Sequence, residues 1–103
     1  MVYRLVNHDP PRAEDFVTHH EHGTRRKAPP CLRAGLSVFR TLDDVIHQRN
    51  LFPSLGVRVA KGALGARHGK TRLTPGKQPT HTTWWPYAEI ERATGFSVVK
   101  ESL

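Results

Sequence analysis

The sequence predicts an α+β fold: a small mixed sheet with two or three short helices and long basic loops. Residues 35–60 have the pattern strand, helix, turn, strand. Residues 2–6 and 96–99 alternate like further strands. The 8 Gly and 8 Pro residues place much of the chain in turns and loops. We expect residues 1–103 to form a single domain, since this length suits one core.

The central unit, residues 35–60, is the most fully specified part of the chain. Residues 36–40 alternate as a strand. Thr41 is a typical helix cap, and the two aspartates after it suit the positive end of a helix dipole. Apolar residues at helical spacing over 42–49 predict one face against a sheet, and 57–60 alternate again. We therefore predict a β-α-β unit, with a right-handed crossover if its strands are parallel.

The other elements follow from the same rules of alternation, capping and turn residues. We expect, in order, a strand over 2–6, a short helix over 13–20, a loop over 23–34, a long loop over 61–80 with a brief hairpin through 71–73, a strand over 81–86, a short helix or turn over 87–94, and a last strand over 96–99. Trp84 and Trp85 should point to opposite faces of their strand, so one of them belongs to the core.

Charge is unevenly distributed along this basic protein. The net charge is +7, and residues 23–34 and 57–79 contain lysines and arginines but no acidic residue. Two basic segments that flank the central unit favour a polyanionic partner, a phosphorylated ligand or an acidic protein. A surface that merely keeps the protein in solution is the alternative.

Several classes of protein are disfavoured. No apolar run is long enough to span a membrane and no secretion signal is recognisable, so we expect a cytoplasmic protein without a membrane partner. Cys31 is the single cysteine, which excludes an internal disulfide. His19, His20 and His22 cluster, but without further ligands at zinc-site spacing we predict no metal.

Three polar features occur in an order known from one enzyme family. Arg4 lies on the first predicted strand, Ser37 lies on the second beside Phe39, and the pair Glu89 and Glu91 comes late in the chain. This order resembles the arginine-serine-glutamate type of the ADP-ribosyltransferase-like fold, which includes small bacterial toxins and effectors. The resemblance implies an enzyme that acts on NAD, either an ADP-ribosyltransferase or an NAD glycohydrolase.

The resemblance also implies roles for these residues. Arg4 and Ser37 would bind NAD, and Phe39 could stack on its nicotinamide ring. Glu91 would be the catalytic carboxylate that stabilises positive charge on the ribose, while Glu89 would orient the nucleophile. If so, Arg4, Ser37 and Glu91 should converge in one cleft.

Two functions without catalysis remain open. The basic segments and an exposed tryptophan would suit a module that binds single-stranded nucleic acid or RNA, with cations on phosphates and a ring on an unpaired base. The expected contacts to nucleic acid or phosphate are Arg25, Arg26, Lys27, Arg67, Lys70, Arg72 and Trp84. Alternatively, the same segments would dock on an acidic protein, which for a toxin would be an antitoxin or immunity protein.

Overall fold

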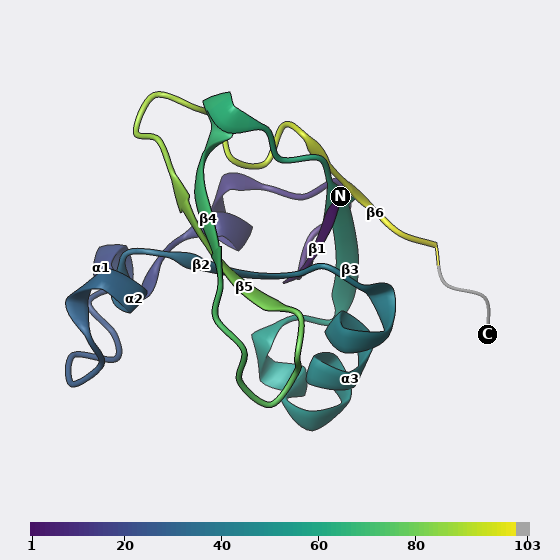
Figure 1. Cartoon of the computed structure of the whole chain (residues 1–103). Coiled ribbons are helices and arrows are strands. Elements are labelled where there is room, and N and C mark those ends of the chain that lie inside the picture. The colour runs from purple at the N-terminus through teal and green to yellow at the C-terminus, as the bar shows by residue number, and fades with distance from the viewer. Residues whose placement is uncertain (101–103) are drawn as a thin grey trace.

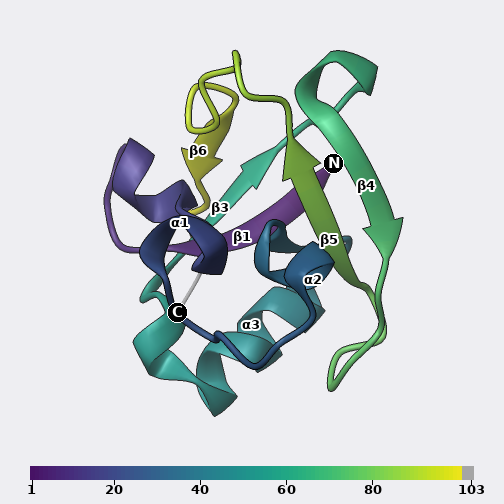
Figure 2. The same cartoon turned by 90° about the vertical axis from the view of Figure 1, so that its left-hand side faces the viewer.

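The computed structural model describes residues 1–100, which form a six-stranded sheet in the order β4-β5-β2-β1-β3-β6 (Figure 1). Every neighbouring pair of strands is antiparallel, so the expectation of a mixed sheet is wrong. Figure 2 shows β4 and β6 at opposite edges of the twisted sheet. The strands are β1 (Val2–Val6), β2 (Leu36–Phe39), β3 (Arg58–Gly62), β4 (Gly69–Leu73), β5 (His81–Pro86) and β6 (Phe96–Val98).

Helices are few and short, as the α+β prediction requires. The described residues contain three α-helices, α1 (His19–His22), α2 (Pro30–Arg33) and α3 (Leu42–Leu51). Short 3₁₀ turns accompany them at η1 (Ala13–Phe16), η2 (Pro53–Leu55) and η3 (Ala66–His68). None of these helices has the length and apolar character needed to cross a membrane.

The central unit forms, but with another strand inside it. β2 and β3 each pair antiparallel with β1, so they run parallel to one another on either side of it. The β-α-β prediction is therefore right in the order and direction of its strands, and wrong if the two strands are taken as neighbours. Helix α3 connects them across one face of the sheet.

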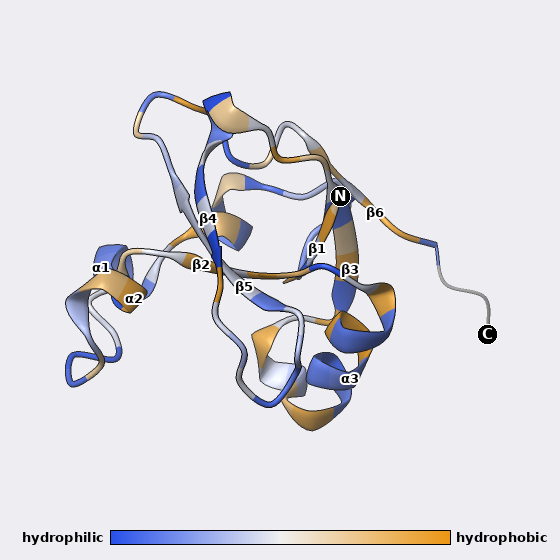
Figure 3. Ribbon diagram, in the orientation of Figure 1, coloured by the Kyte–Doolittle hydropathy of each residue, from blue (hydrophilic) through white to orange (hydrophobic). Residues whose placement is uncertain are grey.

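Helix α3 begins and packs as its sequence predicts. The Thr41 hydroxyl accepts a hydrogen bond of 3.2 Å from the Asp44 amide, which caps the first turn. Val45 is fully buried against Leu5 and Phe39 of the sheet. Figure 3 shows both hydrophilic and hydrophobic positions in the helix, and its exposed residues include Asp43, His47 and Asn50.

A second core lies on the opposite face of the sheet. Trp84 is 1% exposed there, and its ring centroid lies 6.4 Å from that of Phe16 and 5.9 Å from that of Phe96. These three rings cover aliphatic side chains of β1, β2 and β3. Trp84 is therefore the tryptophan of the core, and it cannot stack on a base as expected for a nucleic-acid contact.

Two expected loops contain regular structure. Residues 61–80 include the end of β3, η3 and all of β4, so the long basic loop predicted there is not confirmed, whereas residues 71–73 do lie in a strand, β4, that pairs antiparallel with β5. Residues 23–34 contain α2. The predicted helix over 13–20 is instead split into η1 and α1, because Thr18 takes an extended backbone (φ −76°, ψ 162°) in order to cap α1.

Candidate functional site

The backbone pairing between β1 and β2 is short, so the two strands separate along most of their length. Tyr3 and Phe39 form the one aligned pair of these strands, whereas β1 and β3 are aligned along their whole length. The Arg4 side chain lies where the strands part, and its Nη1 donates a hydrogen bond of 2.7 Å to the Ser37 carbonyl. A side chain thus satisfies a carbonyl at a place where backbone pairing ends.

Arg4 is a half-buried cation. Burial, partly offset by the charge of Asp15 and reinforced by that of Arg92, lowers its pKa to about 10, so it stays charged at neutral pH. Its guanidinium lies 5.4 Å from the centre of the Phe16 ring, and its Nε donates to the Asp15 carbonyl at 3.1 Å.

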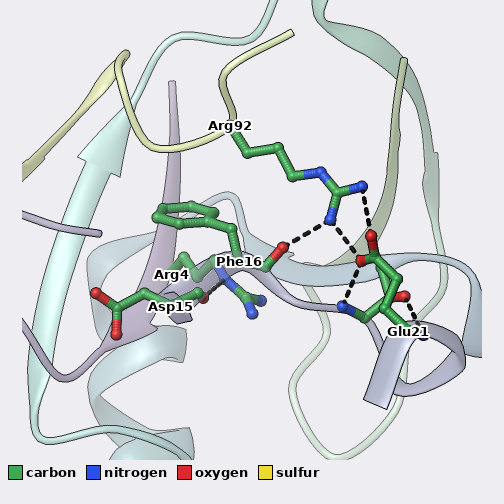
Figure 4. A network of polar contacts seen from close by, with 6 residues as sticks. Arg4, Asp15, Phe16, Glu21 and Arg92 are labelled. Carbon is green, nitrogen blue, oxygen red and sulfur yellow. Dashed lines mark hydrogen bonds and ion pairs between the residues drawn. The ribbon is translucent and has the colours of Figure 1, made fainter. Parts of the chain in front are cut away.

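The carboxylate of Asp15 does not pair with Arg4. It points away from the guanidinium (Figure 4) and accepts hydrogen bonds of 2.9 Å from the amides of Asn7 and Arg12. His8 Nδ1 lies 3.0 Å from the same carboxylate. Within residues 1–100, Arg4 therefore has neutral carbonyl partners and no ion pair.

Arg4, Ser37 and Phe39 line a pocket of about 250 Å³. A second pocket of about 460 Å³ adjoins it, since both are lined by His19, Ser37, Gln48 and Leu55. No aspartate or glutamate lines either pocket. We call the two pockets together the cleft. Its basic side chains are Arg4, His19, Arg25, Arg33 and His81, and its hydroxyl-bearing side chains are Ser37, Ser54, Thr74 and Thr83.

His19 shows how positive the cleft is. Its pKa is lowered, first by burial and then by the charges of Arg25, His22, Arg4 and Arg33. The imidazole is therefore neutral at neutral pH. Its Nδ1 lies 2.8 Å from the Thr24 hydroxyl, which positions the ring beside the cleft.

Ser37 and His81 are in contact inside the cleft. The Ser37 Oγ lies 2.9 Å from His81 Nε2, and His81 Nδ1 lies 2.8 Å from the Thr74 carbonyl. The strand register explains this contact: Ser37 is opposite Thr83 and Phe39 is opposite His81, so Ser37 and His81 are diagonal neighbours on one face. The Phe39 ring packs on the His81 ring edge to face, with centroids 5.3 Å apart.

The two glutamates lie elsewhere. Glu89 and Glu91 are exposed on turns after β5, and the Glu91 carboxylate accepts a hydrogen bond of 3.0 Å from the Thr94 hydroxyl. Glu91 lines a different pocket, of about 510 Å³, together with Arg67 and Trp84. The structure thus brings Arg4, Ser37 and Phe39 together as expected and places Glu91 outside their cleft.

The expected phosphate contacts occupy three places. Arg25 lines the cleft, while Arg26 and Lys27 are exposed next to it in sequence. Lys70 and Arg72 are exposed on the edge strand β4, opposite Trp85 and Thr83. Because Thr83 is also opposite Ser37, these two cations share the sheet face of the cleft, whereas Arg67 lines the pocket of Glu91.

Three residues of the cleft were not predicted as site residues from the sequence: His19, Arg33 and His81. For His81 a weak signal exists, since His81 and Thr83 make one face of a predicted strand polar. His19 and Arg33 lie at the ends of two short helices, and no spacing connects them to Arg4.

No model of a protein family matches the chain, and neither curated proteins nor solved structures show a detectable similarity to it. Across residues 1–100, no three His, Cys, Asp or Glu side chains are grouped as metal ligands. The function therefore has to be argued from the cleft itself.

Proposed function

We propose that the protein binds a phosphorylated nucleotide, NAD in the first instance, in the cleft. One observation carries this proposal: Arg4 is a half-buried cation with no carboxylate partner among the described residues, in a cleft without acidic side chains. A partly buried charge of this kind costs free energy, which the Asp15 carboxylate offsets only in part, so a further anion would stabilise it. Phosphate is one of the anions whose geometry matches the forked donors of arginine.

The rest of the cleft suits a dinucleotide. Its two pockets, of about 250 and 460 Å³, have the size of ordinary small-molecule sites. Arg25 and Arg33 supply further cations along the larger pocket. The diphosphate would lie near Arg4. Phe39 is 2% exposed and packs on His81, so its burial contradicts the expectation that its ring stacks on nicotinamide.

The proposed activity is transfer of ADP-ribose from NAD, or its hydrolysis, in the manner of a bacterial toxin. Such chemistry needs a carboxylate that stabilises positive charge on the ribose, but no aspartate or glutamate lines the cleft, and the expected convergence of Glu91 with Arg4 and Ser37 is not found. Because Glu91 lies outside the cleft, we expect Glu91→Gln to bind NAD as tightly as the wild type. Incubation with labelled NAD and a cell extract then tests whether this carboxylate is needed for turnover.

Calorimetric titration with NAD tests the binding proposal. Arg33→Gln should weaken binding roughly tenfold, the usual effect of losing one charged hydrogen bond. Arg4→Lys keeps the charge but loses the forked geometry, and should also weaken binding. Arg67→Gln removes a cation outside the cleft and should change nothing. No binding of NAD, or equal affinity in all four proteins, would contradict the proposal.

Binding of single-stranded RNA is a second candidate. Lys70 and Arg72 are exposed on the edge strand and share the face of the cleft, so a phosphate chain could follow β4 into it. The burial of Trp84 removes the stacking ring that this candidate was expected to use. An acidic protein, such as an antitoxin, would meet the same cations.

A further inference from the structure

The contact between Ser37 and His81 has the geometry of a nucleophile and its base. The Thr74 carbonyl, 2.8 Å from His81 Nδ1, can only accept a hydrogen bond and favours the tautomer with the proton on Nδ1, while the Thr74 hydroxyl lies farther from this nitrogen, at 3.1 Å. In the neutral ring, Nε2 then has a free lone pair, and the Ser37 hydroxyl 2.9 Å away donates to it. The tautomer that can take a proton from Ser37 is therefore the one that the Thr74 carbonyl selects.

Both groups are accessible. Ser37 is exposed and lines both pockets of the cleft, and half-buried His81 lines the larger one. The Phe39 ring packs against His81, and Thr74 Oγ1 lies 2.7 Å from Thr83 Oγ1, next to the carbonyl that orients the ring. The base is thus positioned by its own partners, independently of Ser37.

The positive charges near Ser37 indicate which class of electrophile it would attack. The Arg4 guanidinium donates to the carbonyl of Ser37, so a cation lies beside the nucleophile, and Arg33 lines the adjoining pocket. Positive groups around a serine stabilise the charge that develops on the oxygens of a phosphoryl group under attack. A phosphodiester or diphosphate is already anionic, so these arginines would also bind it before attack, whereas a neutral carboxylic ester gains negative charge only during attack.

We propose that Ser37 is a nucleophile, that His81 is its general base, and that the electrophile is the phosphorus atom of a phosphodiester or diphosphate bound in the cleft. This inference rests on the proposed function, because the same cations would bind the phosphate. It goes beyond that function, because the bond that breaks is a P–O bond and not the bond to nicotinamide.

The reaction balances without a further reagent. The Ser37 Oγ bonds to phosphorus while its proton passes to His81 Nε2, and the P–O bond to the leaving group breaks with its electron pair on oxygen. His81 returns the proton to that oxygen. A water molecule then attacks phosphorus, giving a proton to Nε2, and the Ser37 Oγ leaves and takes this proton. The net result is hydrolysis of one P–O bond by one water molecule.

Diisopropyl fluorophosphate tests the nucleophile directly, since it transfers its phosphorus to an activated serine and releases fluoride. Mass spectrometry should find one adduct on the full-length protein, on Ser37, and none on Ser37→Ala. Ser97 is exposed on β6 and lines neither pocket of the cleft, so Ser97→Ala is the matched control and should react like the wild type. Adducts on a serine other than Ser37, or on no serine, would overturn the proposal.

His81→Gln tests the base. Glutamine can still donate to the Thr74 carbonyl but cannot take up a proton, so labelling should slow by about 100-fold or more. If this variant does not fold by circular dichroism, His81→Gly with added imidazole replaces it, and imidazole should restore the labelling rate. Labelling of a folded variant at the wild-type rate, or no rescue, would show that the histidine merely connects the strands.

Hydrolysis of bis(4-nitrophenyl) phosphate completes the test, with turnover expected for the wild type and lost in Ser37→Ala. Calorimetry with NAD separates the two proposals. NAD binding without labelling of Ser37 would refute the nucleophile and leave the proposed function intact. Labelling of Ser37 in a protein that does not bind NAD would refute the proposed function and leave the nucleophile intact.

Discussion

The guanidinium of Arg92 binds the carboxylate of Glu21 through two contacts, Nη1 to Oε1 at 2.6 Å and Nη2 to Oε2 at 3.2 Å (Figure 4). Arg92 also donates to the Phe16 carbonyl at 2.7 Å, so the turn before β6 is attached to both η1 and α1. Glu21 in addition accepts a hydrogen bond from the Thr18 amide as part of a capping box. These contacts support the segment that leads from Arg4 to His19.

This ion pair predicts a dependence of stability on pH. Hydrogen bonds from Arg92 and then from Thr18 lower the pKa of Glu21 to about 2, from 4.5 in the unfolded chain. The unfolded state therefore binds more protons, so the stabilisation is complete above pH 4.5 and is lost as the pH falls toward 2. Glu21→Gln should lower the free energy of unfolding by about 1 kcal/mol at neutral pH, since the pair is partly in water.

Urea unfolding of the wild type and Glu21→Gln at neutral pH and near pH 3 measures this effect. The difference between the two proteins should shrink at the lower pH. Glu89→Gln, at an exposed glutamate without a recorded partner in the described residues, is the control and should match the wild type at both values. A constant difference would show that Glu21 acts only through its shape.

From the surroundings of His19 we expect the binding of NAD to be coupled to the uptake of a proton. Burial and the charges around it lower its pKa, and a bound diphosphate would offset the charges of Arg4, Arg25 and Arg33. The pKa should therefore rise on binding, a proton should be taken up, and affinity should increase as the pH falls below neutral. Calorimetry in buffers of different ionisation enthalpy measures the uptake, which His19→Gln should abolish. Equal uptake in that variant would assign the proton to another group.

The burial of Val45 allows a prediction of how much the packing of α3 on the sheet contributes to the free energy of unfolding. It is 0% exposed and packs on the sheet, so Val45→Ala leaves a cavity and should lower the free energy of unfolding by about 2 kcal/mol. Val57→Ala makes the same chemical change at a side chain that is 60% exposed, and should stay within about 0.5 kcal/mol of the wild type. Equal effects of the two changes in denaturant unfolding would mean that α3 does not pack as described.

The RNA candidate predicts a particular dependence on salt. If β4 binds a phosphate chain, the slope of log affinity against log salt concentration should be less steep in a Lys70→Gln/Arg72→Gln double variant. The slope should change by roughly 1 for each cation removed. Arg12 and Arg58 are exposed arginines outside β4, and their double glutamine variant should keep the wild-type slope. Fluorescence anisotropy with a labelled oligonucleotide measures both. If the wild type and both double variants showed the same slope, β4 would not be the surface that contacts RNA.

Local chemistry made most of the fold predictable, and tertiary pairing explains what it missed. The alternation of β1 and the cap of α3 are visible in their own residues. In contrast, none of the residues of β4 is buried, so they form a strand only because β5 offers a partner. The helix over 13–20 was wrong because a residue that caps one helix interrupts another, and periodicity does not detect this.

The site was predictable only in part for a similar reason. Arg4 and Ser37 could be named because each lies in a strand with a clear pattern. His81 joins them through the register of β5 against β2, which the sequence does not reveal. Alternation placed Trp84 and Trp85 on opposite faces without saying which face is the core. The order of Glu91 along the chain gave no information about its distance from Arg4.

The position of β1 between β2 and β3 has a consequence for folding. β1 precedes both of its neighbours along the chain, so it can pair with β2 only after Phe39 has been made, and along its whole length with β3 only after Gly62 has been made. Such distant pairing slows folding and makes it cooperative. A fragment that ends before β3 would keep Tyr3 and Phe39 as the one aligned pair of β1, and it would lack His81 and therefore the complete cleft.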